Sequence, residues 1–221
     1  SNTAVGYQAG FGNTTHSNVV AIGWKASFTS NRTTGSLANS TFIGSQSGEA
    51  NSCTIGARND VTYVGYNSGQ HPSQTTANMS QNTAIGSGAF RHTAHTTGPS
   101  YFNTAVGVEA LAMNASTSQN TTNNTAVGDR SLTNNIASNN TAIGRYSGYN
   151  NTTGSFNTYV GTNSGQSMST GAKNTILGSY NGNQGGLDIR TSSNYVVLSD
   201  GDGNPNAYWR KSVINIPFNV F

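Results

Sequence analysis

Charged residues and cysteine are both scarce in this sequence. Asp, Glu, Lys and Arg make up only 8% of the 221 residues, and hydrophobic residues make up 33%. The low charge excludes a charge-driven disordered chain, and the small apolar fraction argues against a wide, deep core. Cys53 is the single cysteine, so an intrachain disulfide is excluded, and we interpret Cys53 as a small buried filler.

Long apolar runs and concentrated positive charge are also absent. No segment approaches the roughly 20 apolar residues of a membrane-spanning helix, and Ser1 opens directly into polar sequence without a signal-peptide pattern. The net charge of +3 is the balance of ten basic and seven acidic side chains. The basic ones are scattered over the chain, whereas a groove for nucleic acid concentrates them. We therefore expect neither membrane insertion nor a nucleic-acid partner.

Groups suited to catalysis are equally sparse. Hydrolysis of a polysaccharide normally requires two carboxylates that face one cleft, and the only close pair among the seven acidic residues is Asp200 and Asp202. The serines lack the strand-turn-helix context of a nucleophile elbow. The sequence therefore predicts a protein that is not an enzyme, with no catalytic residues and no cofactor.

What the sequence does have is an internal repeat built from Asn, Thr, Ser and Gly, which supply 31, 29, 28 and 27 residues. The motif Asn-Thr-Ala-(Val/Ile)-Gly, complete or degenerate, recurs with 16, 17 or 21 residues between its glycines. An eleventh copy, in which Gly is replaced, ends at Ser199. Repeats of this length indicate a solenoid. The ten motif glycines are Gly6, Gly23, Gly44, Gly65, Gly86, Gly107, Gly128, Gly144, Gly161 and Gly178.

Each repeat unit has the features of one solenoid coil. The alternation in Thr-Ala-Val-Gly predicts a short strand, and the glycine after it predicts a tight corner, where positive φ and a closely approaching backbone favour glycine. A second short segment and a polar return loop complete the unit. One large apolar residue precedes each corner, and we expect these residues to stack from coil to coil as the core. This predicted core ladder is Val5, Ile22, Ile43, Val64, Ile85, Val106, Val127, Ile143, Val160 and Leu177.

The predicted fold is therefore an all-β, repetitive parallel β-solenoid or β-roll. Asn side chains are expected to form hydrogen-bonded ladders between its coils. With the large apolar residues pointing inward, Ala and Gly would form an outer face that is flat and too apolar to leave exposed to water. We expect self-association to cover this face.

The motif and its continuation, as in Asn140 to Ser155, resemble the repeats of phage tail-fibre proteins and are similar to the β-roll heads of trimeric autotransporter adhesins. The resemblance implies an intertwined homotrimeric fibre, in which three parallel β-rolls wind around one threefold axis. It also implies a structural virion protein, located in the tail fibre and involved in host attachment. Its partners would be further copies of itself, neighbouring fibre or tail proteins, and a host-surface glycan or protein. We divide the chain into a β-roll shaft at 1–186 and a C-terminal β-hairpin cap or transition segment at 187–221.

The C-terminal segment contains one pattern that is similar to a metal-binding loop. Asp200, Asp202 and Asn204 have the spacing of the first three ligands of a calcium loop. However, Pro205 and Lys211 occupy the positions where such a loop requires Gly and a bidentate Glu. We therefore predict a hairpin turn here, and no metal site in the chain.

Loop histidines and aromatic residues are the remaining candidates for ligand contact. His92 and His95 lie in a polar insertion without nearby Cys or carboxylate, so we expect a solvated loop and not a zinc site; His16 and His71 are also placed in return loops. Aromatic side chains in the variable loops can stack on sugars, although packing between coils or chains is the favoured interpretation. The candidate glycan contacts are Trp24, Tyr101, Phe102, Tyr146 and Tyr149, considered together with Phe28, Phe90 and Phe156.

Three functions stay open, of which the virion fibre is favoured. The first alternative is the head of a bacterial trimeric surface adhesin at the bacterial cell surface, which would need a secretion signal, a coiled-coil stalk and a membrane anchor. The second alternative is an ice-binding β-solenoid, because stacked threonines would form a flat ladder, although Val20 interrupts it. The threonines concerned are Thr3, Thr83, Thr104, Thr125, Thr141, Thr158 and Thr175.

Overall fold

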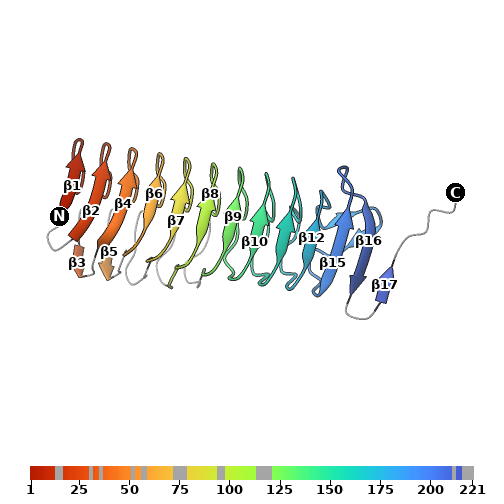
Figure 1. Cartoon of the computed structure of the whole chain (residues 1–221). Coiled ribbons are helices and arrows are strands. Elements are labelled where there is room, and N and C mark those ends of the chain that lie inside the picture. The colour runs from red at the N-terminus through yellow and green to blue at the C-terminus, as the bar shows by residue number, and fades with distance from the viewer. Residues whose placement is uncertain are drawn as a thin grey trace.

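The chain folds into a rod of stacked coils that lie side by side from the N-terminus onwards (Figure 1). The computed structural model describes residues 1–12, 17–29, 32–34, 37–50, 53–55, 59–71, 79–93, 98–112, 121–210 and 213–215. Every regular element in these ranges is a β-strand, and the strands of successive coils are parallel. The prediction of an all-β parallel solenoid is therefore confirmed.

One 13-stranded sheet runs the length of the rod. Equivalent motif positions stand opposite each other, as Thr141 does to Thr158 and Ile143 to Val160. A short parallel pair, β3 (Arg32–Thr34) with β5 (Cys53–Ile55), lies outside this sheet; the side chain of Cys53 is not among those described, so its burial stays a prediction. The parallel strands of the long sheet are β1 (Asn2–Val5), β2 (Ser17–Ile22), β4 (Ala38–Ile43), β6 (Thr62–Val64), β7 (Thr83–Ile85), β8 (Thr104–Val106), β9 (Thr125–Val127), β10 (Thr141–Ile143), β11 (Thr158–Val160), β12 (Thr175–Leu177) and β15 (Tyr195–Ser199).

The corner glycines are required by both conformation and space. All ten predicted corner glycines have φ between 108° and 135°. A Cβ atom on Gly107 would lie 2.5 Å from the carbonyl oxygen of Gly128 in the next coil. The amide of Gly107 donates to the carbonyl of Ile85 in the preceding coil at 2.8 Å. The corners are therefore places where the backbones of successive coils approach closely, as the sequence predicts.

The interior is a narrow column that is filled from two sides. The inward strand position is buried in every coil from β2 to β15, and the fourth residue after each corner glycine faces it from the turn. Where the strand supplies a ring, the turn supplies glycine: a Cβ atom on Gly48 would overlap the ring of Phe42. In three coils the strand supplies alanine and the turn supplies bulk, as with Ala84 and Phe90. The same exchange pairs Tyr63 with Gly69, Tyr159 with Gly165, Ala105 with Leu111, and Ala126 with Leu132. In the coil of Ala142 the turn has Gly148, and side chains of the two neighbouring coils fill the space.

The large apolar residue before each corner does not lie in this column, so the predicted core ladder is wrong. Strand alternation allows only one of the two neighbours, Ala or Val/Ile, to face inward. Where the turn fills the column with a bulky side chain, only the smaller neighbour fits inside. In three coils whose turn has glycine, a ring takes the inward position and Val or Ile still faces outward. Ala84 is fully buried, whereas Ile85 is 42% exposed. The residues found in register on the outer face, exposed or half-buried, are Val5, Ile22, Ile43, Val64, Ile85, Val106, Val127, Ile143, Val160 and Leu177.

A buried ladder of asparagine amides runs beside the core, which confirms the expected role of Asn between coils. Asn103 Oδ1 accepts the backbone N–H of Asn124 at 3.0 Å, and Asn103 Nδ2 donates to the carbonyl of Thr121 at 2.8 Å. Each amide thus ties one strand to the next coil and to a return loop. Buried amides of this kind are stable only when both their donor and their acceptor are satisfied. The other members are Asn82, Asn124, Asn140, Asn157 and Asn174.

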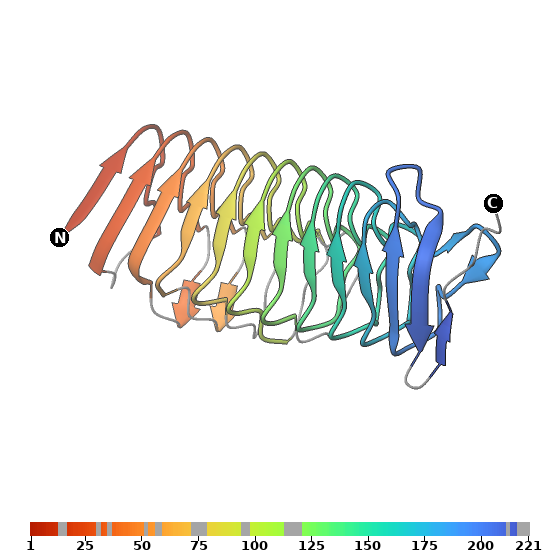
Figure 2. The ribbon, with the colours of Figure 1, turned by 45° about the vertical axis from the view of Figure 1, so that its right-hand side comes forward.

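Two antiparallel strands, β16 (Pro205–Arg210) and β17 (Val213–Asn215), end the long sheet (Figure 2). The parallel ladder includes β15, so the stacked part continues beyond residue 186 to Ser199, and the predicted hairpin begins there. A small antiparallel pair, β13 (Asn183–Gln184) with β14 (Leu187–Asp188), precedes it. An added antiparallel strand covers the strand edge that the last coil would otherwise expose.

Replacing Gly107 with Val should reduce the free energy of unfolding by about 3 kcal/mol or more, because the side chain meets the neighbouring backbone and strains a positive φ. The matched control is Gly88→Ala, where φ is 64° and the nearest atoms to an added Cβ lie at 3.5 Å. The control should lose only about 1 kcal/mol. Urea titrations followed by circular dichroism measure both. If both variants lost the same free energy of unfolding, contact with the next coil would not be what restricts position 107 to glycine.

The exchange of bulk between strand and turn predicts a coupled pair. Phe90→Gly alone should cost about 3–5 kcal/mol, because it leaves a cavity beside Ala84. Adding Ala84→Phe reproduces the combination of Phe42 with Gly48 and should recover more than about 1 kcal/mol of that loss. Ala84→Phe alone should destabilise by overpacking. Additive effects in this double-mutant cycle, measured by urea unfolding, would contradict the shared column.

Candidate functional site: the strand face and the turn edge

The outer side of the long sheet carries two parallel ladders of side chains, which we call the strand face. The apolar ladder consists of the ten residues before the corner glycines and continues with Leu198 of β15. Two residues earlier in each strand, eight threonines stand in register from β4 to β12. These threonines are Thr41, Thr62, Thr83, Thr104, Thr125, Thr141, Thr158 and Thr175.

The strand face is regular, uncharged and exposed. Within the apolar ladder Val5 is 57% exposed and Ile143 is 43% exposed. Neighbouring side chains repeat every ~4.7–4.9 Å between strands and every ~6.6–6.8 Å along a strand. Among the residues of the two ladders none is charged. A continuous apolar surface of this kind is typical of a contact surface.

The first two residues after each corner glycine, together with Arg91 further along one turn, form a second surface, which we call the turn edge. There, ionic and aromatic side chains connect successive coils. Glu109 lies 3.6 Å from Arg91 Nη2 and accepts a hydrogen bond of 2.8 Å from Arg130 Nε. Arg130 Nη1 donates to the hydroxyl of Tyr146 at 2.8 Å, and Arg145 lies over the ring of Tyr146. The hydrogen bond to Glu109 raises the pKa of Arg130. The side chains of Arg91, Glu109 and Arg130 remain partly open to solvent, so their ion pairs contribute little to stability and serve mainly to align the coils.

The candidate glycan contacts do not form one site. Trp24 is 45% exposed, and Lys25 Nζ lies 4.7 Å from the centre of its ring. Tyr101 and Phe102 pack edge to face, with ring centres 5.0 Å apart. Tyr146 and Tyr149 pack in the same way at 5.4 Å. The structure thus places the five residues in three separate groups. Of the others considered with them, Phe28 and Phe90 are buried and Phe156 is exposed.

Two histidines are buried, which corrects the expectation of solvated loops. His71 and His92 have ring centres 4.5 Å apart, and Phe90 packs edge to face on His92 at 4.8 Å. Their rings lie beside the column that Phe90 fills. His16 and His95 lie outside the described residues. No group of three or more His, Cys, Asp or Glu placed to hold a metal ion occurs in the part of the chain that the structure describes.

The pattern similar to a calcium loop forms a turn that uses its own carboxylate. Asp200 Oδ1 accepts the backbone N–H groups of Asn204 at 2.8 Å and of Asp202 at 3.0 Å. These bonds, the one from Asn204 first, lower the pKa of Asp200. The residues join β15 to β16, as predicted for a hairpin turn.

Sequence reasoning placed the contact surface on the strands but assigned it to the wrong side of the pleat. A signal that identifies the outer side is the glycine at the fourth position after the corner in each of the three coils whose strand carries a ring, Phe42, Tyr63 or Tyr159. The described residues include no helix with the length and hydropathy that crossing a bilayer requires. Comparison of the chain with protein-family models, with curated proteins and with solved structures finds no match.

Proposed function

We propose that this chain is a structural segment of a virion tail fibre that assembles as a homotrimer and takes part in attachment to the host surface. The observation that carries the proposal is the strand face, an uncharged apolar ladder exposed along the whole rod. Exposing such an apolar face to water is unfavourable, and packing it against the same face of an identical copy removes it from water. The resemblance of the repeats to phage tail-fibre proteins supports three copies.

The energetics favour association over the full length of the rod. Removing the remaining exposed part of one ladder side chain from water contributes about 0.5–1 kcal/mol. Summed over the ladder, this is on the order of 5–10 kcal/mol per chain. Association costs about 4–15 kcal/mol in lost motion, so a few coils would not suffice and many are needed. A rigid shaft with a repeated contact meets this requirement.

The polar turn edge and return loops would then face outward, toward neighbouring fibre or tail proteins and toward a host-surface glycan or protein. The head of a bacterial trimeric surface adhesin would use the same assembly at a cell surface. The flanking sequence of the full protein distinguishes the two, since only the adhesin requires a secretion signal, a stalk and a membrane anchor.

Ice binding is a second candidate, because eight threonines stand in register on a regular, uncharged face. Under this alternative the strand face meets ice, and the chain stays monomeric. Measurement of thermal hysteresis in a nanolitre osmometer tests it directly. The fibre proposal expects none, so a hysteresis that disappears in Thr104→Lys would favour ice binding instead.

Light scattering coupled to size exclusion should give a mass near three times 22.9 kDa. The double variant Ile143→Lys, Val160→Lys places two charges on adjacent strands of the apolar ladder and should shift the mass to that of a monomer, because buried unpaired charges are costly. The control Thr162→Lys adds charge at an exposed position on the turn edge and should stay trimeric. A wild-type monomer, or a double variant that keeps the wild-type mass, would rule out association through the strand face.

A further inference from the structure

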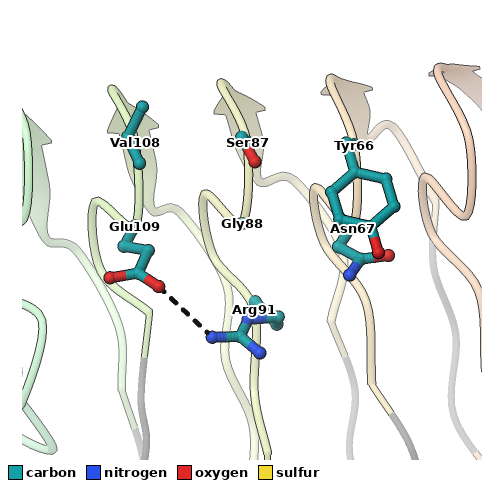
Figure 3. Close-up of a pocket in the computed structure, with 7 residues that line it drawn as sticks. All are labelled: Tyr66, Asn67, Ser87, Gly88, Arg91, Val108 and Glu109. Atoms are coloured by element: carbon teal, nitrogen blue, oxygen red, sulfur yellow. Dashed lines mark ion pairs between the residues drawn. The ribbon is translucent and has the colours of Figure 1, made fainter.

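A hollow of about 320 Å³ opens on the turn edge beside the turn that follows β7 (Figure 3). Three successive turns line it. Tyr66 and Asn67 come from the turn after β6, and Val108 and Glu109 come from the turn after β8. Arg91, from the intervening coil, forms the base between them. None of these residues belongs to the strand face, so the two surfaces can be tested separately.

The hollow exists because one coil lacks two large side chains that its neighbours carry. At the first position after the corner glycine, Ser87 stands between Tyr66 and Val108. At the second position, Gly88 stands between Asn67 and Glu109. These two small residues in one coil therefore leave a gap among the side chains at both the first and the second position after the corner glycines.

The fold does not require glycine at position 88. Its φ of 64° is close to that of non-glycine residues at the same place in other coils, such as 58° for Gln46 and 50° for Glu109. A Cβ atom on Gly88 would have its nearest contacts at 3.5 Å and 3.6 Å, which is ordinary packing distance. The backbone would accept a side chain here, so the open space is a property of this sequence and not of the solenoid.

The walls offer one aromatic face and several polar groups. The side chain of Tyr66 is 55% exposed. Asn67 Oδ1 is buried and accepts no hydrogen bond from the described residues. Arg91 lies 3.6 Å from Glu109, too far for a close hydrogen bond, and Glu109 is held on its other side by Arg130 at 2.8 Å. The hollow thus presents a carboxylate and a guanidinium beside an exposed ring.

This chemistry fits a neutral, hydroxyl-rich ring better than other ligands. The carboxylate of Glu109 disfavours an anion, the guanidinium of Arg91 disfavours a cation, and the amide of Asn67 disfavours an apolar guest. A hexopyranose has an apolar C–H face for the tyrosine ring and hydroxyls that both donate and accept. The volume is near the lower end of small-molecule sites, as suits one sugar unit.

We propose that this hollow binds a single hexopyranose unit of a glycan. Tyr66 stacks on the sugar ring, and Glu109 and Arg91 form hydrogen bonds with its hydroxyls. The site deepens the attachment role proposed above and rests on it only for its biological setting, because sugar binding is a property of the chain itself.

Saturation-transfer difference NMR tests the site with three probes: the methyl glycosides of glucose, galactose and N-acetylglucosamine. At least one glycoside should receive saturation from the wild-type protein. Adding the corresponding free sugar should reduce that signal by competition. Tyr66→Ser removes the ring and introduces the residue found at Ser45 and Ser87 in the equivalent position. Gly88→Gln fills the hollow with the residue found at Gln46. Both variants should lose the transfer while keeping the wild-type circular dichroism spectrum.

The matched control is Tyr7→Ser, which removes a tyrosine that is 67% exposed at the same position of the first coil, away from the hollow. This variant should bind as the wild type does. The site is overturned if no probe receives saturation from the wild type, if Gly88→Gln still binds, or if Tyr7→Ser loses binding equally. The mass of the assembly is measured on the same samples, so failure of the sugar site is distinguished from failure of the trimer.

Discussion

The close approach of one corner glycine to the next is the constraint on which this structure depends. An added Cβ atom at any of these corners would lie within 2.6 Å of the backbone of the following coil. This approach sets the spacing of the coils at one point in every turn. The register of the strands, the stacking of the asparagine amides and the two straight ladders of the strand face all follow, since each needs equivalent residues at a constant separation.

A coil built this way encloses little space, and the composition reflects that limit. Where strand and turn face each other, no coil has a bulky side chain from both, and many of the other buried positions are Ala, Ser or Asn. Serines in the turns donate to carbonyls of the next coil, as Ser47 Oγ does to Tyr63 at 2.8 Å. Side-chain hydrogen bonds between coils thus take the place of a deep core. Apolar residues that cannot be accommodated inside remain outside, where they form the surface that we assign to assembly.

Much of the fold could be predicted from the sequence, because a repeat displays its constraints many times. The strands, the positive φ at Gly107 and its equivalents, the asparagine ladder and the turn at Asp200 were all accessible from spacing and residue type. Which side of the strand faces inward was not, since alternation places Ala84 and Ile85 on opposite sides without saying which is inside. The burial of His71 and His92 depends on contacts between coils that no single repeat contains. The hollow at Gly88 was also missed, although Ser87 and Gly88 in succession were a visible signal.

The repeats differ in length while their strands do not differ in spacing. Units of 16, 17 and 21 residues occur in one rod, yet the equivalent motif residues of all of them pair in a single parallel sheet. Additional residues are accommodated in the return loops, away from the corners. The length of the rod is therefore determined by the number of repeats and not by the number of residues. Insertions within a unit would change the loops on the surface but not the length of the rod. Only the gain or loss of a whole unit would change that length, in fixed steps of one strand spacing.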